Sequence, residues 1–291
     1  MGVKLRELRP SDLADARRML REACPFDRAA DVAEEKLFGP APSGTTRAWA
    51  ASDGGALCGV AAASGRWVRL VAVAPPQRGR GVGTGLLSEA EAWIAGAGHD
   101  TASALDQPGN YLAPGIDERN EPTIAWLERR GWQRGKPNVN LLIDVATNPR
   151  VSPERLDRAE ANVRAAGYDI REATPHDIAS YRGCIAQEFS LGWAFELERA
   201  DVHIACRGSE LAAFAAHDGN NRGLGWFGPA GTRAQHRKRG LGEVLLLRCL
   251  LDVAAAGHDV CAIAWIGPRE FYERAVGAAP ERRYISMTKP L

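Results

Sequence analysis

The chain repeats one pattern twice along its length, and this repeat limits what it can fold into. Residues 78–83 read Arg-Gly-Arg-Gly-Val-Gly, and residues 237–242 read Arg-Lys-Arg-Gly-Leu-Gly. In both copies a leucine pair and then a Gly-His-Asp tripeptide follow the motif. The second copy of each feature lies 159 residues after the first, as Arg237 lies 159 residues after Arg78. Ordered matches at several places are typical of a duplicated domain and not of a chance hexapeptide.

The length of 291 residues suits two ordinary domains of about 150 residues each. We predict an N-terminal domain over 1–146, a linker helix within 147–168 and a C-terminal domain over 169–291. The segment before the linker helix is polar and rich in turn residues. Ser152 is the predicted N-cap of that helix, and Pro153 occupies its first helical position.

Hydrophobic periodicity predicts the same order of elements in both copies. Strand patterns at 46–51, 56–63 and 68–73 precede helical spacing at 83–95, and the second copy has its corresponding helix at 242–255. Mixed strands and helices in this order indicate an α+β fold. Each domain is therefore expected to contain a central mixed β-sheet flanked by helices.

Each repeated motif follows a predicted strand and opens a predicted helix. Glycines let the backbone turn there, so that several N–H groups and the positive end of the helix dipole face one point. Basic side chains add charge to the two motifs, namely Arg78, Arg80, Arg237, Lys238 and Arg239. So many donors favour a diphosphate ligand over a single carboxylate.

Two other phosphate-binding patterns do not fit. A P-loop needs G-x-x-x-x-G-K-[ST] and a dinucleotide fingerprint needs G-x-G-x-x-G, and neither copy has either spacing. Both copies fit R-x-x-G-x-G, at Arg78, Gly81 and Gly83 and again at Arg237, Gly240 and Gly242.

These loops resemble the pyrophosphate loop of the GNAT superfamily, the N-acetyltransferases that use acetyl-CoA. The resemblance rests on 70–87 and 232–246, and on Asn120, which precedes the pair Gly131-Trp132 by eleven residues. It covers nearly the whole chain apart from the linker helix. It implies that the strand before each loop separates from its neighbour and that the pantetheine arm runs beside it. The cofactor-binding residues implied are Val71, Val73, Arg78, Gly79, Arg80, Gly81, Val82, Gly83, Thr84 and Asn120 in the first half, and Ala230, Thr232, Arg237, Lys238, Arg239, Gly240, Leu241 and Gly242 in the second.

The resemblance also implies direct attack of an amine on a thioester, with a strand N–H polarising the carbonyl and a tyrosine protonating the thiolate. The first half has Leu127 at the position of that tyrosine. The second half has Tyr272, displaced by one residue from the family's spacing. We therefore expect Tyr272 to be the catalytic acid and the C-terminal half to be the catalytic one. For the base, the glutamates Glu34, Glu35, Glu188 and Glu196 are weak candidates.

The expected function is transfer of an acetyl group from acetyl-CoA to an amine of a small molecule or peptide. Since each half departs from the family pattern, a non-catalytic acyl-CoA-binding or scaffold protein is the alternative. A tandem acetyltransferase similar to mycothiol synthase is a further one. The acceptor and the oligomeric state are not predicted.

Composition excludes several other classes. Lys+Arg number 37 and Asp+Glu 36, so the net charge of +1 does not suit a dedicated nucleic-acid binder. No apolar run approaches the length of a membrane span. The six cysteines form no C-x-x-C pair, which favours free thiols and a cytoplasmic location. The six histidines show no metal-ligand spacing, so no metal site is expected.

Overall fold

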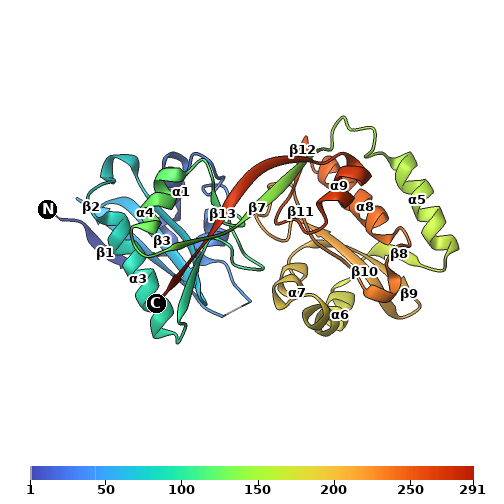
Figure 1. The fold of residues 1–291 in the computed structure, drawn as a ribbon, viewed down its shortest axis with the longest axis horizontal. Helices are drawn as coiled ribbons and strands as arrows, with labels where there is room; N and C mark the ends of the chain where they lie inside the picture. Colours follow the sequence, from blue (N-terminus) through green and yellow to red (C-terminus); the bar gives the residue numbers. More distant parts are fainter. Residues whose placement is uncertain (1, 43) are drawn as a thin grey trace. The chain divides into compact units, whose positions relative to one another are not determined.

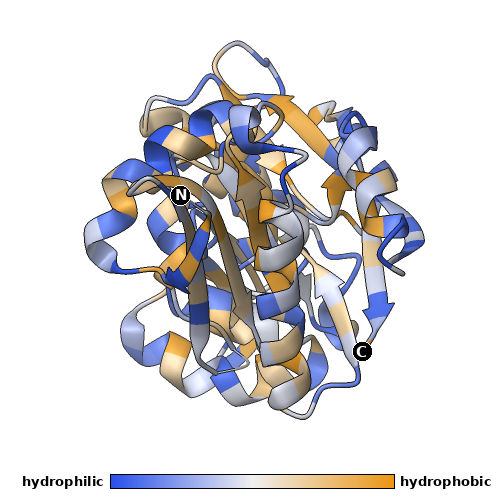
Figure 2. Ribbon diagram, turned by 90° about the vertical axis from the view of Figure 1, so that its left-hand side faces the viewer, coloured by the Kyte–Doolittle hydropathy of each residue, from blue (hydrophilic) through white to orange (hydrophobic). Residues whose placement is uncertain are grey.

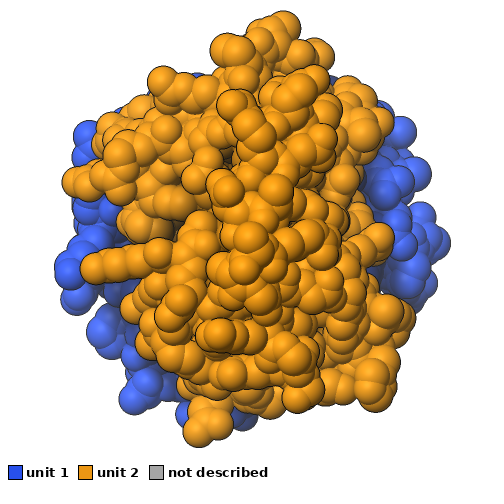
Figure 3. All heavy atoms as spheres, turned by 90° about the vertical axis from the view of Figure 1, so that its right-hand side faces the viewer, with its two compact units in different colours: residues 1–138, 283–291 blue, residues 139–282 orange. Residues whose placement is uncertain are grey.

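The computed structural model describes residues 2–42 and 44–291 (Figure 1). The chain divides into two compact units, coloured separately in Figure 3. Unit 1 consists of Met1–Asn138 and Arg283–Leu291, and unit 2 of Val139–Arg282. Within the described residues, no helix has the length and apolar character needed to cross a bilayer.

Unit 1 contains one mixed sheet with the strand order β1-β2-β3-β4-β5-β13. All neighbours in it are antiparallel except β4 and β5, which are parallel. Its elements are β1 (Lys4–Glu7), α1 (Leu13–Ala23), α2 (Ala33–Phe38), β2 (Thr46–Asp53), β3 (Ala56–Ser64), β4 (Trp67–Val73), α3 (Val82–Gly96), β5 (Thr101–Ala104), β6 (Ile116–Asp117), α4 (Glu121–Glu128) and the end of β13 (Ala279–Pro290).

Unit 2 repeats this plan with the strand order β8-β9-β10-β11-β12-β7, and here β11 and β12 are the parallel pair. The linker helix α5 packs in this unit and begins at its predicted cap, where the Ser152 side chain accepts a hydrogen bond from the Arg155 N–H. The elements are the end of β7 (Gln133–Asp144), α5 (Pro153–Ala165), β8 (Asp169–Glu172), α6 (Pro175–Glu188), α7 (Leu191–Leu197), β9 (Asp201–Arg207), β10 (Glu210–His217), β11 (Trp226–Thr232), α8 (Leu241–Ala255), β12 (Val260–Ile263) and α9 (Arg269–Val276).

The two units exchange their last strands. The second half of β7 pairs with β12 of unit 2, with Ile143 opposite Cys261. The end of β13 pairs with β5 of unit 1, with Thr288 opposite Ser103. Each sheet is thus completed by a strand that begins in the other half of the sequence. The contiguous ranges 1–146 and 169–291 expected from the repeat do not describe this exchange, because a repeat in sequence carries no information about which sheet the final strand joins.

Each core lies between the sheet and its helices. In Figure 2 the central strands are predominantly orange, whereas the helices carry blue residues on their outer surfaces. Small residues on the middle strands allow close packing, since Ala61 and Ala63 of β3 and Ala213 and Ala215 of β10 are buried. Against them pack the apolar sides of α3 and α8, which contribute Leu86 and Leu245 among others.

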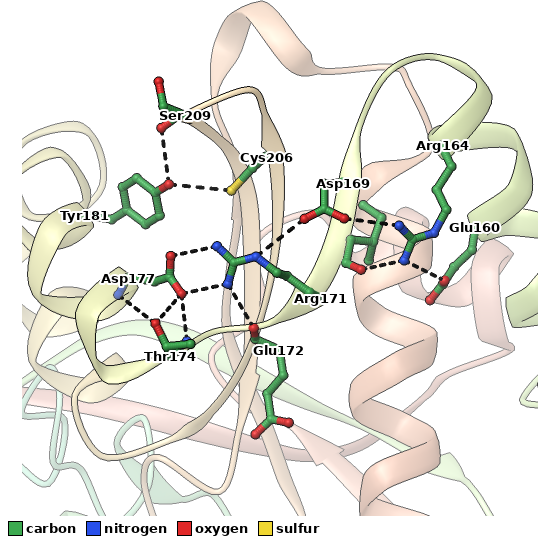
Figure 4. Close-up of polar contacts among 11 residues, drawn as sticks. Glu160, Arg164, Asp169, Arg171, Glu172, Thr174, Asp177, Tyr181, Cys206 and Ser209 are labelled. Carbon is green, nitrogen blue, oxygen red and sulfur yellow. Dashed lines mark hydrogen bonds and ion pairs between the residues drawn. The ribbon is translucent and has the colours of Figure 1, made fainter.

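In each unit, the same set of hydrogen bonds joins the first strand to the start of the helix that follows it. In unit 2, Asp177 accepts hydrogen bonds from both Nη atoms of Arg171, at 2.7 and 2.8 Å, and from the Thr174 N–H at 2.8 Å (Figure 4). In unit 1, Asp12 accepts in the same way from Arg6, at 2.7 and 2.9 Å. Each carboxylate therefore ties the strand at the sheet edge to the chain that enters the following helix.

Sequence patterns located most elements within a few residues but missed several of them. The predicted helices 83–95 and 242–255 correspond to α3 and α8. The short helices α2 and α7, the two-residue strand β6 and the long strand β13 were not predicted. The two helices are too short for a hydrophobic period to show, and β13 is mostly polar over its first half.

Replacing Asp177 with asparagine removes the charge that Arg171 and Thr174 surround. We expect the free energy of unfolding at pH 7 to fall by about 1–2 kcal/mol, a modest loss because Arg171 is partly exposed. The hydrogen bonds from Arg171 hold the pKa of Asp177 well below its usual value. Such a group stabilises the fold above its unfolded pKa, about 3.9, and this contribution disappears as the pH falls. Urea unfolding at several pH values should show the deficit shrinking below about pH 4.

The matched control for this variant is Asp157→Asn. Asp157 is exposed on α5 and forms no ion pair in the described part of the chain. Its replacement should leave stability unchanged at every pH. A deficit for Asp177→Asn that is the same at pH 3 and pH 7 would contradict the assignment.

Met287→Ala tests the strand exchange. The Met287 side chain is fully buried in the core of unit 1, with Ile116 and Trp132, although it lies four residues from the end of the chain. Removing it should destabilise unit 1 by about 2–5 kcal/mol. Hydrogen exchange should then show faster opening of β5 in unit 1 and unchanged protection of β12 in unit 2. The opposite pattern would mean that β13 completes the sheet of its own half.

Candidate functional site: two matching loops and the strands before them

The two Arg-x-x-Gly-x-Gly loops have the same backbone conformation. Arg78 has φ −67° and ψ 156°, and Arg237 has φ −65° and ψ 159°. Gly81 and Gly240 both adopt the left-handed conformation, at φ 83° and 82°, directly before α3 and α8. Lys238 also has a positive φ, 61°, a conformation that costs energy for a residue with a side chain. The repeat in sequence is therefore a repeat in structure.

Each loop presents a group of unbonded N–H donors. No hydrogen bond is formed by the N–H groups of 79–84 in unit 1 or of 238–242 in unit 2 to any part of the chain that the structure describes. Gly81 and Gly240 are exposed. Exposed N–H groups at the start of a helix of fifteen residues form a site suited to phosphate oxygens.

The basic side chains of the two motifs differ in whether they have a hydrogen-bond or ion-pair partner within the described residues. The Nε atoms of Arg78 and Arg237 donate to the last carbonyl of the preceding strand, Val73 O at 3.1 Å and Thr232 O at 3.2 Å. Arg80 forms an ion pair with Asp53 at 3.2 Å. The sequence predicted all these arginines as mobile charge around a diphosphate, but in the structure Arg78 and Arg237 hold the strand ends.

The other two basic residues of the motifs, Lys238 and Arg239, lie in unit 2. Lys238 and Arg239 are exposed, and neither forms an ion pair with any described residue. The second loop thus has more unpaired positive charge than the first. Nothing in the sequence motif distinguished the two loops in this respect, because the partner Asp53 lies on another hairpin.

The strand before each loop separates from its parallel neighbour, as the family resemblance implied. β4 pairs with β5 at only two positions, the last being Val68 with Ala104. β11 pairs with β12 at two positions as well, the last being Phe227 with Ile263. Beyond these last pairs the two parallel strands diverge, and we call this point the fork. A β-bulge lies just beyond each fork, at Arg69 in β4 and at residues 228–229 in β11.

The hydrogen bonds of β4 to β3, and of β11 to β10, show which main-chain groups face the strand edge that is left open beyond the fork. The Ala74 N–H donates to Cys58 O of β3 at 2.9 Å, so by alternation the main-chain groups of Val71 and Val73 point away from β3. In unit 2 the Arg233 N–H donates to Ala212 O at 2.9 Å, and the same alternation applies. The main-chain groups of Ala230 and Thr232 therefore point to the open edge there.

Aromatic side chains of the last helices pack behind the loops. A Cβ atom on Gly83 would lie 3.4 Å from the Trp126 ring, and one on Gly242 would lie 3.5 Å from the Phe271 ring. Val82 and Leu241 are buried in the two cores, so their side chains anchor the helix starts. Thr84 is less free than predicted, because its Oγ1 accepts a hydrogen bond from Arg130 at 2.7 Å.

Asn120 occupies the N-cap position of α4 without a side-chain capping bond. Its carbonyl oxygen accepts hydrogen bonds from the N–H groups of Thr123 and Ile124. Its main-chain N–H donates to Asp117 O at 2.8 Å, whereas its side-chain amide forms no hydrogen bond with any described residue.

Tyr272 lies at the fork between β11 and β12. Its ring centroid is 6.1 Å from that of Phe227, the last paired residue of β11, and 5.0 Å from that of Phe271. The side chain is 8% exposed, and burial raises the pKa of Tyr272 to about 12. Its hydroxyl forms no hydrogen bond within the described residues. Leu127 of α4 is buried in the core of unit 1 and provides no acid.

The glutamates considered as bases are mostly paired. Glu35 contacts Lys36 at 2.7 Å, and Glu188 contacts Arg233 at 2.6 Å. Glu34 forms a long, exposed pair with Arg17 at 3.5 Å, and Glu196 is buried. None of them is an unpaired carboxylate beside the fork in unit 2.

Asp106 is a carboxyl group that sequence reasoning missed. It follows Leu105, whose N–H donates to Val68 O at the fork of unit 1. Burial raises the pKa of Asp106 to about 6, and its Oδ1 atom has no partner among the described residues. A carboxyl with this pKa can accept a proton near neutral pH. Its one signal in the sequence was its place directly after a short strand.

Comparisons with known proteins match part of the chain to a family and the whole chain to a fold. The model of the acetyltransferase (GNAT) family matches residues 13–132. No curated protein matches the chain in sequence. Among solved structures, the chain is similar to a tandem GNAT protein from the clavulanic acid biosynthesis pathway, with 18% identity, a TM-score of 0.72, and coverage of 99% of this chain and 98% of that one.

Two further structures have the same fold. One is a GCN5-related glucosamine N-acetyltransferase region of a fungal multidomain GH3 β-N-acetylglucosaminidase, with 17% identity and a TM-score of 0.79. It covers 99% of this chain, which spans 38% of the length of that protein. The other is a GCN5-related N-acetyltransferase from Sphaerobacter thermophilus, with 18% identity, a TM-score of 0.68, and coverage of 99% and 95%. Residues 13–132 thus match the GNAT acetyltransferase family, and the chain as a whole has the same fold as a tandem GNAT protein.

Proposed function

We propose that this protein is an acetyl-CoA-dependent N-acetyltransferase that acts on an amine of a small molecule or peptide, with its catalytic site in unit 2. The observation that carries the assignment to unit 2 is the position of Tyr272 against Phe227, at the fork where β11 leaves β12. The six cysteines, all unpaired, support the expected cytoplasmic location.

The residues present fit the cofactor. The open N–H groups of 238–242, with the free cations Lys238 and Arg239, suit a diphosphate. The unpaired main chain of Ala230 and Thr232 suits the amide groups of a pantetheine arm. Acetyl-CoA would supply a thioester carbonyl for attack by an amine.

Tyr272 holds the proton needed at the end of the reaction. With its pKa raised to about 12, the phenol is protonated throughout the neutral range. A neutral hydroxyl without a hydrogen-bond partner in the described chain is available to donate to a thiolate as that anion departs. An N–H of the open edge of β11 would polarise the carbonyl, as an oxyanion hole does.

Unit 1 is proposed as the supporting copy. Leu127 replaces the acid, Arg80 is paired with Asp53, and Thr84 is bonded to Arg130. Asp106, however, gives unit 1 a base-like carboxyl that unit 2 lacks at the equivalent fork. The alternative of a non-catalytic acyl-CoA-binding protein therefore needs a direct test, whereas no described contact favours a mycothiol-synthase-like substrate.

Tyr272→Phe should lower kcat by about 100-fold while leaving acetyl-CoA affinity unchanged, since it removes a proton donor and keeps the ring. The assay is thiol release from acetyl-CoA with a panel of amines. Asp106→Asn is the matched variant for unit 1 and should retain wild-type kcat. If instead Asp106→Asn abolishes turnover and Tyr272→Phe does not, unit 1 is the catalytic half. Absence of turnover with every amine would favour the binding-protein alternative.

Gly240→Val should weaken acetyl-CoA binding in unit 2 by about tenfold or more, because a branched side chain disfavours the left-handed conformation that points the N–H groups outward. Gly81→Val should do the same in unit 1. Isothermal titration calorimetry would count the sites lost. Gly208→Val is the control, since Gly208 has φ 61° and open space around its Cβ position but lies in the β9–β10 hairpin. Failure of the wild type to bind acetyl-CoA would refute the proposal.

A further inference from the structure

Three ligand-type side chains of unit 2 converge away from the loop. His203 lies on β9, His217 on β10 and Asp252 on α8. One potential ligand atom from each lies within 4.8 Å of the others. His203 Nε2 makes a short contact with Asp252 Oδ2, and His217 Nε2 lies 3.5 Å from the same oxygen.

The sheet register explains why the two histidines meet. β9 and β10 are antiparallel, with His203 opposite Ala215 and His217 opposite Asp201. Both side chains therefore lie on one face of the sheet as diagonal neighbours. That face also carries Ala213 and Ala215, which pack in the core formed with α8. The small alanines let α8 approach closely and bring Asp252 over the histidine pair.

The cluster contains more ligand atoms than its hydrogen bonds use. Each histidine side chain is only 9% exposed. His217 Nε2, which faces Asp252, is buried and has no hydrogen-bond partner among the described residues. Leaving a buried polar nitrogen unsatisfied is costly, so it indicates a missing partner. Asp252 is about half exposed, so this partner can enter from solvent and the carboxylate can turn to meet it.

We propose that His203, His217 and Asp252 form a binding site for a divalent transition-metal cation of the zinc type. Two imidazoles and one carboxylate are ligands that such cations prefer, and with neutral histidines the site carries one negative charge. Bonds of about 2.0–2.2 Å need only a small closure of the three side chains. This site was not expected from the sequence, because its ligands come from three elements and have no motif spacing.

The bound cation would act as a clamp. It would join β9, β10 and the C-terminal half of α8, the helix whose first turn forms the second loop. Three protein ligands leave a position for water on the side of Asp252. Since the site lies at the other end of α8 from Gly240, it is independent of the acetyltransferase proposal, and either can fail alone.

The test is titration of metal-free full-length protein with Co²⁺, followed by displacement with Zn²⁺. We expect one Co²⁺ per chain, with visible d–d bands and without the near-ultraviolet charge-transfer band that a cysteine ligand would produce. Asp252→Asn and His217→Ala should each weaken binding by about tenfold or more, by analogy with losses at metal ligands and their supports. Asp252→Asn keeps a hydrogen-bond acceptor for His203 and so preserves the fold.

His176→Ala is the matched control, because His176 is exposed on α6 and remote from these elements in the sequence. It should bind Co²⁺ as the wild type does. Circular dichroism of each metal-free variant would verify folding, and Zn²⁺ at one concentration should raise the melting temperature of the wild type more than that of folded Asp252→Asn. Absence of stoichiometric binding in the wild type, binding through sulfur, or equal affinity in Asp252→Asn and the wild type would each overturn the proposal.

Discussion

The separation of two parallel strands is the constraint on which the rest of each unit depends. β4 and β11 each pair with a parallel neighbour for two residues and then diverge at a bulge. Main-chain groups left without a partner inside a sheet are costly unless another molecule or water satisfies them. The loop that follows keeps the strand end in place, because Arg78 and Arg237 donate to the last strand carbonyls. The open strand edge and the loop of N–H donors thus form one construction, which occurs once in each unit.

The two copies keep this construction but differ in the side chains around it. The loop of unit 2 has free cations and a protonated phenol at the fork. Unit 1 has its loop arginine and threonine engaged by neighbours, a leucine in place of the phenol, and a buried carboxyl with a raised pKa. A duplicated domain can lose its chemistry in one copy while its backbone stays the same, because the backbone is stabilised by glycines, strand pairing and the core.

Because of the strand exchange, the two halves of the sequence do not coincide with the two folded units. β7 and β13 each cross from one unit to the other, so the cores of both units contain residues from distant parts of the chain, such as Met287 in unit 1. Neither half of the sequence holds a complete sheet by itself. Truncating the end of the chain would therefore open the first domain, a consequence that the repeat does not suggest.

The sequence by itself determined the duplication, the α+β class and the two loops, because glycines at set spacings and alternating apolar residues constrain the backbone locally. The forked strands were implied by the family resemblance and not by local spacing. It also identified Tyr272 and Leu127 as the difference between the halves. Only the tertiary structure decided which sheet receives β7 and β13, which arginines are occupied, and that Asp106 is desolvated. It alone brought His203, His217 and Asp252 together, since their proximity depends on strand register and on the packing of α8, and both arise from long-range contacts that no local spacing records.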